Sequence, residues 1–306
     1  MSEDLRQRIL NVAVQSNIAL GISLADRLGI FPALGKTGSE AAPAHYDAVA
    51  KEAGLKPRYT KELLALLACG DIITVTPDGD HFYMSPAAAE VLNSPIKDKG
   101  VSLCLFVPMH AQVFNPISEV FQLNGPLGME YANYGDFYGT MDELSASLHK
   151  KHLVPDLVPL TGMKEALEAG ISFLDTDARA MDPSWNDKFE FVMIFDACHD
   201  QCRPDLAIKE IYRVLKSGGV FAMVEIDGTS NVYEDRQTFG IGCAAFYSAS
   251  VFHCLPVGSN TPDALAMGTM MGTKKGRKLL LDAGFNDIKI EKVPFFDFNV
   301  LYLAKK

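Results

Sequence analysis

The residues best suited to chemistry are His199 and Asp200, in the loop that follows an apolar run at Phe189–Phe195. Imidazole titrates near neutral pH, so His199 is the natural candidate for a general base, and Asp200 would orient its ring. The alternative is a solvated histidine whose neighbour caps the next helix. The sequence leaves both interpretations open.

Cysteine and histidine recur near this loop, which raises the question of a metal site. Cys198, His199 and Cys202 lack a fourth nearby ligand and the usual spacing of paired zinc cysteines, so we expect no metal here. The adjacent residues His253 and Cys254 are a weaker second candidate for a chemical role.

The elements that position the loop form one continuous pattern. Phe189–Phe195 is typical of a buried strand, and Asp196 ends it. Pro204 is suited to a first helical turn, and Gly218-Gly219 to a left-handed stop. Val220–Ile226 is then predicted to be a second buried strand.

The carboxyl ends of these two strands should form the site. Parallel strands joined by one helix bring their carboxyl ends to the same edge, and open α/β sheets bind ligands at that edge. Asp196–Asp200 and Glu225–Gly228 are therefore expected to line one site.

Composition narrows the class of protein. The 306 residues are 48% hydrophobic and 22% charged and carry a net charge of −10, which argues against a nucleic-acid partner. No signal-peptide core is evident and no stretch approaches about 18 uninterrupted apolar residues, so we expect a cytoplasmic protein without a membrane partner. Six cysteines are too sparse for a disulfide framework and are expected to be reduced.

The N-terminal region, residues 1–95, has the pattern of a winged helix. Tyr46–Ala53 and Pro57–Cys69 are two predicted helices, and a predicted hairpin follows within 71–84. Such a module binds DNA or mediates dimerisation. Eight Lys plus Arg against eleven Asp plus Glu give residues 1–95 a net charge of 8 − 11 = −3, which favours dimerisation.

Residues 96–165 are predicted to be a helical linker or lid, and residues 166–306 an α/β domain. The linker carries four aromatic residues that would either shape the roof of a pocket or pack in the core. They are Tyr131, Tyr134, Phe137 and Tyr138. Near the C-terminus, Lys274–Ala283 is predicted to be an amphipathic helix, followed by closing strands at Ile288–Val293 and Phe298–Ala304.

With these pieces placed, the C-terminal half resembles the class I S-adenosyl-L-methionine (SAM)-dependent methyltransferases. The matching segments are Thr176–Met181, the strand that ends at Asp196, Leu215–Val220 and Leu279–Phe285. The winged-helix pattern is similar to the dimerisation domain of small-molecule O-methyltransferases. The resemblance implies a Rossmann-like sheet, SAM as cofactor, a small-molecule substrate, O-methyl transfer and a homodimer.

The resemblance also assigns roles to residues. Asp177 and Ala178 would meet the adenine of SAM, and Asp196 and Ala197 would flank its reactive end. In O-methyltransferases a His-Asp pair after this strand supplies the general base, which corresponds to His199 and its neighbour.

One part of the family pattern is absent from the sequence. Such a domain opens with a strand, a GxGxG turn, a helix and a second strand that ends in an acidic residue. Here a helical segment runs through Ala169 directly into Ile171–Leu174, which resembles the third strand of the family. The single GxG, Gly240–Gly242, lies inside an apolar helical run.

We therefore expect an incomplete sheet that lacks its first two strand-helix units, with SAM binding weakened. Ile171–Leu174 is predicted to pair beside Phe189–Phe195. Two functions stay open: methyl transfer to a small-molecule nucleophile, or a catalytically impaired relative with a structural or interaction role.

Overall fold

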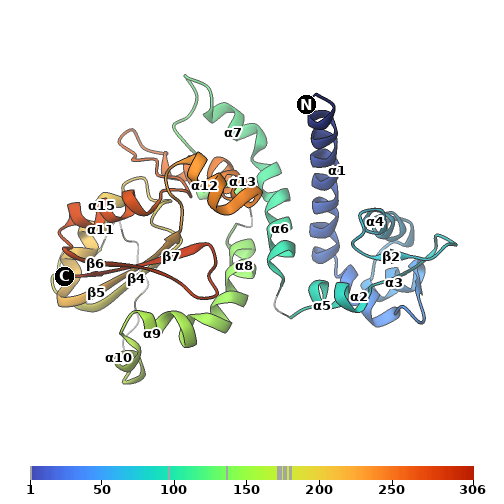
Figure 1. The fold of residues 1–306 in the computed structure, drawn as a ribbon, viewed down its shortest axis with the longest axis horizontal. Helices are drawn as coiled ribbons and strands as arrows, with labels where there is room; N and C mark the ends of the chain where they lie inside the picture. Colours follow the sequence, from blue (N-terminus) through green and yellow to red (C-terminus); the bar gives the residue numbers. More distant parts are fainter. Residues whose placement is uncertain (1, 96, 136, 171–173, 175–177, 179–180) are drawn as a thin grey trace. The chain divides into compact units, whose positions relative to one another are not determined.

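A computed structural model describes residues 2–95, 97–135, 137–170, 174, 178 and 181–306. The chain divides into two compact units, drawn in Figure 1. The first unit is Met1–Ala111 with Asp136–Ser147, and the second is Gln112–Gly135 with Leu148–Lys306. The domain boundaries expected from the sequence, 1–95, 96–165 and 166–306, stay a prediction.

The first unit contains the predicted winged helix. Helices α3 (Tyr46–Ala53) and α4 (Pro57–Cys69) have the expected bounds, and Gly54, at φ 69°, ends α3 in the left-handed region. A small antiparallel sheet of order β1-β3-β2 completes the module, with β1 before α3 and the other two strands after α4. Its strands are β1 (Ala44–His45), β3 (His81–Tyr83) and β2 (Thr74–Val75). The other helices that begin in this unit are α1 (Ser2–Arg27), α2 (Ile30–Thr37), α5 (Pro86–Leu92), α6 (Lys99–Gln112) and α8 (Phe137–His152).

Two helical stretches have the length and apolar composition of a membrane span. They are Asp4–Arg27, within α1, and Val232–Gly258. Neither contains a long uninterrupted apolar run, which is why the sequence pattern did not mark them. The absence of a membrane partner therefore stays a prediction.

The second unit is built on a four-stranded sheet of order β4-β5-β7-β6 (Figure 1). Strands β4 (Phe189–Phe195) and β5 (Leu215–Ile226) are parallel, while β7 (Asn299–Lys305) runs antiparallel to both β5 and β6 (Asp287–Lys292). Successive side chains of a strand point to opposite faces, so both faces of this sheet bear apolar residues.

Each face of the sheet has its own core. On one face, Phe221 and Tyr302 pack with helices α11 (Pro204–Val214) and α15 (Thr273–Ala283). On the other, Val224 packs with Leu157 and Phe296. The inner strands β5 and β7 are thus largely buried, as expected for apolar strands covered on both faces. β4, which was also predicted to be buried, is only half-buried, because among the described strands it lies at the end of the sheet.

The sequence prediction placed the end of α11 too late in the chain, at Gly218-Gly219. The helix ends at Val214, and Leu215 already has extended geometry and pairs with Phe189. Leu215 is fully buried, so its side chain is held in the core at the start of β5. Gly218 does adopt a left-handed φ of 79°, but within the irregular first part of that strand.

Helices surround the rest of the second unit. They are α7 (Phe114–Val120), η1 (Tyr131–Tyr134), η2 (Leu153–Leu157), α9 (Val158–Leu160), α10 (Lys164–Glu168), α12 (Val232–Phe239), η3 (Gly240–Gly242), α13 (Cys243–Ala249), η4 (Ser250–Cys254) and α14 (Leu255–Gly258). The apolar segment after β5 is thus helical, and the single GxG forms a helical turn inside it.

The predicted strand at Ile171–Leu174 falls almost entirely on residues 171–173, outside the described residues. Among the strands that the structure describes, β4 pairs with β5 alone. The loops after β4 and β5 meet at the carboxyl edge of the sheet, as the parallel pairing requires.

Candidate active site

Glu225 fixes the loop that follows β4. It lies near the end of β5, is 1% exposed, and its Oε1 accepts hydrogen bonds from the backbone N–H groups of Cys198 (2.9 Å) and His199 (3.3 Å). Its other oxygen, Oε2, pairs with Nδ1 of the His199 ring. One carboxylate therefore sets both the backbone of the loop and the orientation of the imidazole.

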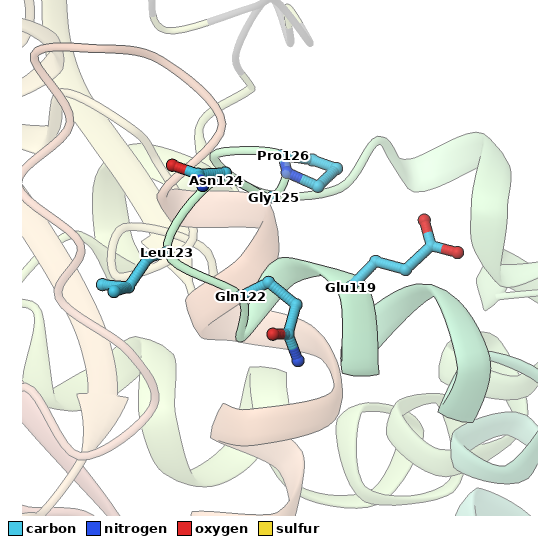
Figure 2. Close-up of a pocket in the computed structure, with 6 residues that line it drawn as sticks. All are labelled: Glu119, Gln122, Leu123, Asn124, Gly125 and Pro126. Carbon is cyan, nitrogen blue, oxygen red and sulfur yellow. The ribbon is translucent and has the colours of Figure 1, made fainter.

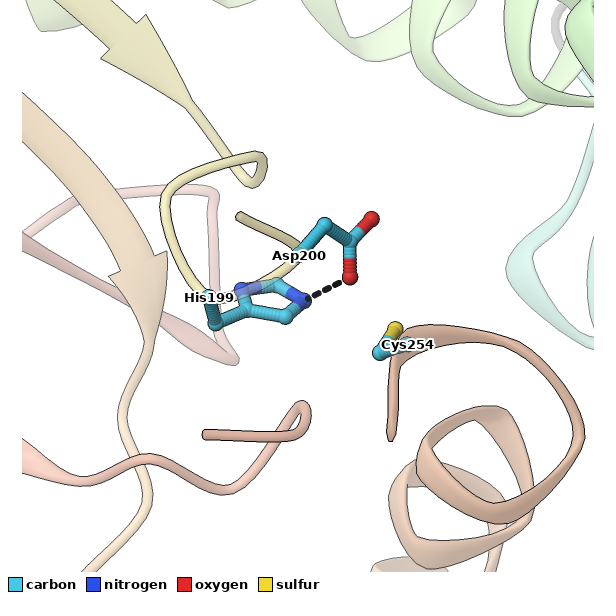
Figure 3. A group of neighbouring side chains, drawn as sticks. All are labelled: His199, Asp200 and Cys254. Carbon is cyan, nitrogen blue, oxygen red and sulfur yellow. Dashed lines mark ion pairs between the residues drawn. The ribbon is translucent and has the colours of Figure 1, made fainter. Parts of the chain in front are cut away.

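Asp200 faces the opposite nitrogen of the ring. Its Oδ1 lies 3.3 Å from His199 Nε2, and its Oδ2 accepts a hydrogen bond of 3.2 Å from the Tyr131 hydroxyl. Figure 3 shows the ring and the carboxylate side by side. His199 is 3% exposed and Asp200 8%, so the imidazole is enclosed between two buried acids.

This enclosure changes the acidity of His199. Burial lowers the pKa of the imidazole, but the negative charge of Glu225, the hydrogen bonds with Cys254 and Glu225, and then the charge of Asp200 outweigh that effect and raise the pKa well above its usual value. The two carboxylates that raise its pKa also stabilise the imidazolium that a general base becomes.

Asp196 forms the corner between β4 and the loop. Its backbone is left-handed, with φ 46°, and Asn299 Nδ2 donates to both carboxylate oxygens at 2.7 and 2.9 Å. Burial, followed by the negative charge of Glu225, raises the pKa of Asp196 to about 7. Ala197, which follows it, is half-buried.

A helical segment distant in the sequence closes the site. His253 and Cys254, both buried, end the π-helical turn η4. The His253 ring lies 5.5 Å from that of Tyr131 and 4.7 Å from that of Tyr134, and its Nδ1 is 3.9 Å from Asp200 Oδ2. Burial lowers the pKa of His253.

The structure adds His253 and Cys254 to the residues that the sequence expected to line one site. His199, Asp200, Glu225 and the pair His253 and Cys254 form one cluster. The spacing of residues in the sequence did not predict that η4 contacts the loop after β4, because this contact depends on the path of the chain through α12, η3 and α13. Of the four aromatic residues, Tyr131 and Tyr134 line the cluster, while Phe137 and Tyr138 belong to the first unit.

The two residues expected at the adenine have no established role. Asp177 lies outside the described residues, and Ala178 packs against the core of the sheet. A hollow of about 650 Å³ lies elsewhere, around the turn at 119–126 (Figure 2). Its lining residues come from the end of α7 and the turn that follows it, and they include none of the cluster described above. They are Glu119, Gln122, Leu123, Asn124, Gly125 and Pro126.

Comparisons with known families identify the domains of the chain. Residues 162–254 match the model of a methyltransferase domain, and residues 16–94 match that of an Rv2258c-like winged HTH domain. The chain carries a methyltransferase domain behind a winged helix. No curated protein matches the chain.

Solved methyltransferases share its fold. Human N-acetylserotonin methyltransferase in complex with SAM is similar at 16% identity, with a TM-score of 0.65 over 100% of this chain and 99% of that one. The mitomycin 7-O-methyltransferase MmcR is similar at 12% identity, with a TM-score of 0.67 over 100% and 99%. A structure of PigF with SAH is similar at 14% identity, with a TM-score of 0.66 over 98% of each chain. At these identities the likeness establishes the fold.

Proposed function

We propose that this methyltransferase-family protein acts on a small molecule by O-methyl transfer, with His199 as the group that takes the hydroxyl proton. The observation that carries the proposal is the buried Glu225–His199–Asp200 arrangement at the carboxyl edge of β4 and β5. A substrate hydroxyl that takes the place of Asp200 at His199 Nε2 would give up its proton to a ring already held in position.

Glu225 is the positioning residue in this scheme. Its contact with Nδ1 keeps a proton on that nitrogen, so Nε2 is the atom left to accept the proton of the substrate. As the ring gains positive charge, both buried carboxylates stabilise it. Because these carboxylates raise the pKa of His199, transfer should be favoured at alkaline pH, where the ring is neutral.

SAM would supply the electrophilic methyl group. Asp196 and Ala197, which by resemblance flank its reactive end, are present at the end of β4. The Asp196 carboxylate is already bound by Asn299, the GxG of η3 is helical, and the sequence holds no GxGxG turn or acidic ribose clamp. The residues present thus fit only the reactive end of SAM. We propose that the sheet lacks its first two strand-helix units and that SAM therefore binds weakly.

The second candidate is a catalytically impaired relative with a structural or interaction role. It is favoured by the position of β4, which among the described strands has a neighbour on one side alone. Both candidates are consistent with a cytoplasmic homodimer formed through the winged-helix region.

Transfer of a labelled methyl group from SAM to a panel of small hydroxylated compounds tests the proposal. At saturating acceptor, we expect a slow rate that keeps rising up to millimolar SAM and that His199→Ala lowers by about 10²- to 10⁴-fold. A labelled product formed equally by wild type and His199→Ala would exclude the role of His199. Absence of product at every SAM concentration would favour the second candidate.

A further inference from the structure

Three side chains at this site present the kinds of atom that bind a transition metal. One ligand atom from each of His199, Asp200 and Cys254 lies within 4.8 Å of the other two, and all three residues are buried (Figure 3). His199 and Asp200 come from the loop after β4, and Cys254 comes from η4. We propose that this cluster binds a zinc ion.

The spacing of the ligand atoms suits a tetrahedral ion. His199 Nε2 and Asp200 Oδ1 are 3.3 Å apart, but Oδ1 accepts no hydrogen bond from any residue that the structure describes. Two ligands bound to zinc at 2.0–2.2 Å are separated by roughly 3.3–3.6 Å in tetrahedral geometry. The two atoms are therefore placed as neighbouring ligands, and Cys254 Sγ supplies a third.

The neighbours of the ligands hold them as metal sites require. A histidine that binds a metal through one nitrogen usually donates the other N–H to a carboxylate, and Glu225 takes this place at His199 Nδ1. The Tyr131 hydroxyl holds the far oxygen of Asp200 at 3.2 Å. Three protein ligands leave a fourth position for water or for a substrate oxygen, as in catalytic zinc sites.

Charge and ligand type select the ion. The buried carboxylates of Asp200 and Glu225 flank the His199 imidazole, and buried acids need compensating positive charge. A divalent cation would provide that charge while the Cys254 thiol and the imidazole Nε2 each release a proton. Imidazole and thiolate ligands favour zinc over magnesium or calcium.

This inference does not depend on methyl transfer. An ion on His199 Nε2 would occupy the nitrogen that the proposed general base uses, so the ion and the substrate proton would compete. Zinc would then inhibit transfer, and removing it would restore the base.

Cobalt, which replaces zinc and is coloured, tests the site in the full-length chain. Titration of metal-free protein with Co²⁺ should give one ion per chain and a thiolate-to-cobalt charge-transfer band in the near ultraviolet. Competition with a chromophoric chelator should show zinc binding weakened by about 10- to 100-fold or more in Cys254→Ser. Cys202→Ser is the matched control, because Cys202 Sγ donates to the Val257 carbonyl at 3.4 Å and lies outside the cluster.

Three outcomes would overturn the proposal: no binding of either ion, cobalt binding without the thiolate band, or equal zinc affinity in Cys254→Ser and wild type. The wild-type spectrum decides the question even if the variant fails to fold. Loss of the band in Cys202→Ser would instead assign the thiolate to Cys202 and also refute the site.

Discussion

At the scale of single residues, the site is governed by carboxylates that surround one imidazole. Glu225 and Asp200 contact the two nitrogens of His199, and Asp196 lies at the start of the same loop. Each buried acid raises the cost of ionising its neighbours, while the imidazolium offsets part of that cost. The pKa values of Asp196 and His199 are both raised as a result.

Glu225→Gln should lower the pKa of His199. The amide keeps the size of the side chain but removes the charge that opposes the effect of burial. The His199 ring signals in an NMR pH titration of metal-free protein give the measurement. Glu190→Gln, which removes an exposed carboxylate paired with Lys216, is the control and should leave the titration unchanged. Equal His199 pKa values in Glu225→Gln and wild type would disprove the electrostatic role of Glu225.

Stability should fall as the pH rises. Asp196 has a pKa raised from its unfolded value of about 3.9 to about 7, so its neutral form is favoured in the fold and stability is lost between these two values. His199 has a raised pKa as well, so its contribution is complete below about pH 6.5 and is lost as the pH rises through the folded value.

Denaturant unfolding of metal-free protein between pH 4 and pH 9 measures this dependence. Asp196→Asn removes the ionisable group, so the free energy of unfolding of the variant should decline less between about pH 4 and pH 7 than that of the wild type. The variant should therefore gain stability relative to the wild type as the pH approaches 8. A free energy of unfolding that rises from pH 5 to pH 8 in the wild type would contradict the raised pKa values.

At the scale of elements, the sequence predicted the unit that carries the site. The apolar run of β4, the helical spacing of α11 and the second apolar run of β5 are local signals, and the rule for parallel strands then placed Asp196–Asp200 beside Glu225. What local patterns did not reveal are the contacts that depend on distant chain segments. The hydrogen bonds from Asn299 to Asp196 and the return of η4 to the loop are of this kind.

The packing of α15 on β7 gives a prediction at the same scale. A Cβ at Gly276 would lie 2.8–3.0 Å from atoms of the Tyr302 ring and hydroxyl, so Gly276→Ala should destabilise the protein by about 1–3 kcal/mol. Gly242→Ala is the matched control, because its Cβ meets nothing within 4 Å and its φ of −59° suits alanine.

Chemical denaturation of both variants gives the measurement. Gly242→Ala should be neutral or stabilising by up to about 1 kcal/mol. Gly276→Ala with wild-type stability would show that Tyr302 moves freely, which the buried core does not predict. A large loss in Gly242→Ala would mean that η3 is not the helical turn described.

At the scale of the whole molecule, α1 exposes an unusual amount of apolar surface. Leu5, Ile9 and Val12 are 58%, 61% and 55% exposed, and a helix with such a surface favours a partner. A second copy of the chain is the partner that the family resemblance implies. We expect a dimer by light scattering, converted to a monomer by the double substitution Ile9→Asp with Val12→Asp.

Gln7→Asp with Asn11→Asp adds the same charge at exposed polar positions of α1 and should leave the dimer intact. A wild-type chain that is monomeric in detergent-free buffer would contradict the expected homodimer. Flotation with lipid vesicles that depends on Ile9 and Val12 would instead assign the apolar surface to a membrane.

Also at the scale of the whole molecule, the central proposal is that this chain retains the residues that accept the substrate proton but binds SAM with weakened affinity. Isothermal titration of the purified, metal-free chain with SAM tests it most directly. Two lost hydrogen bonds to charged or buried groups, at about 1–3 kcal/mol each, should weaken SAM binding by about 30-fold to more than 10⁴-fold relative to a complete site, so we expect no saturation at micromolar SAM. A saturable isotherm with a micromolar dissociation constant would contradict the claim.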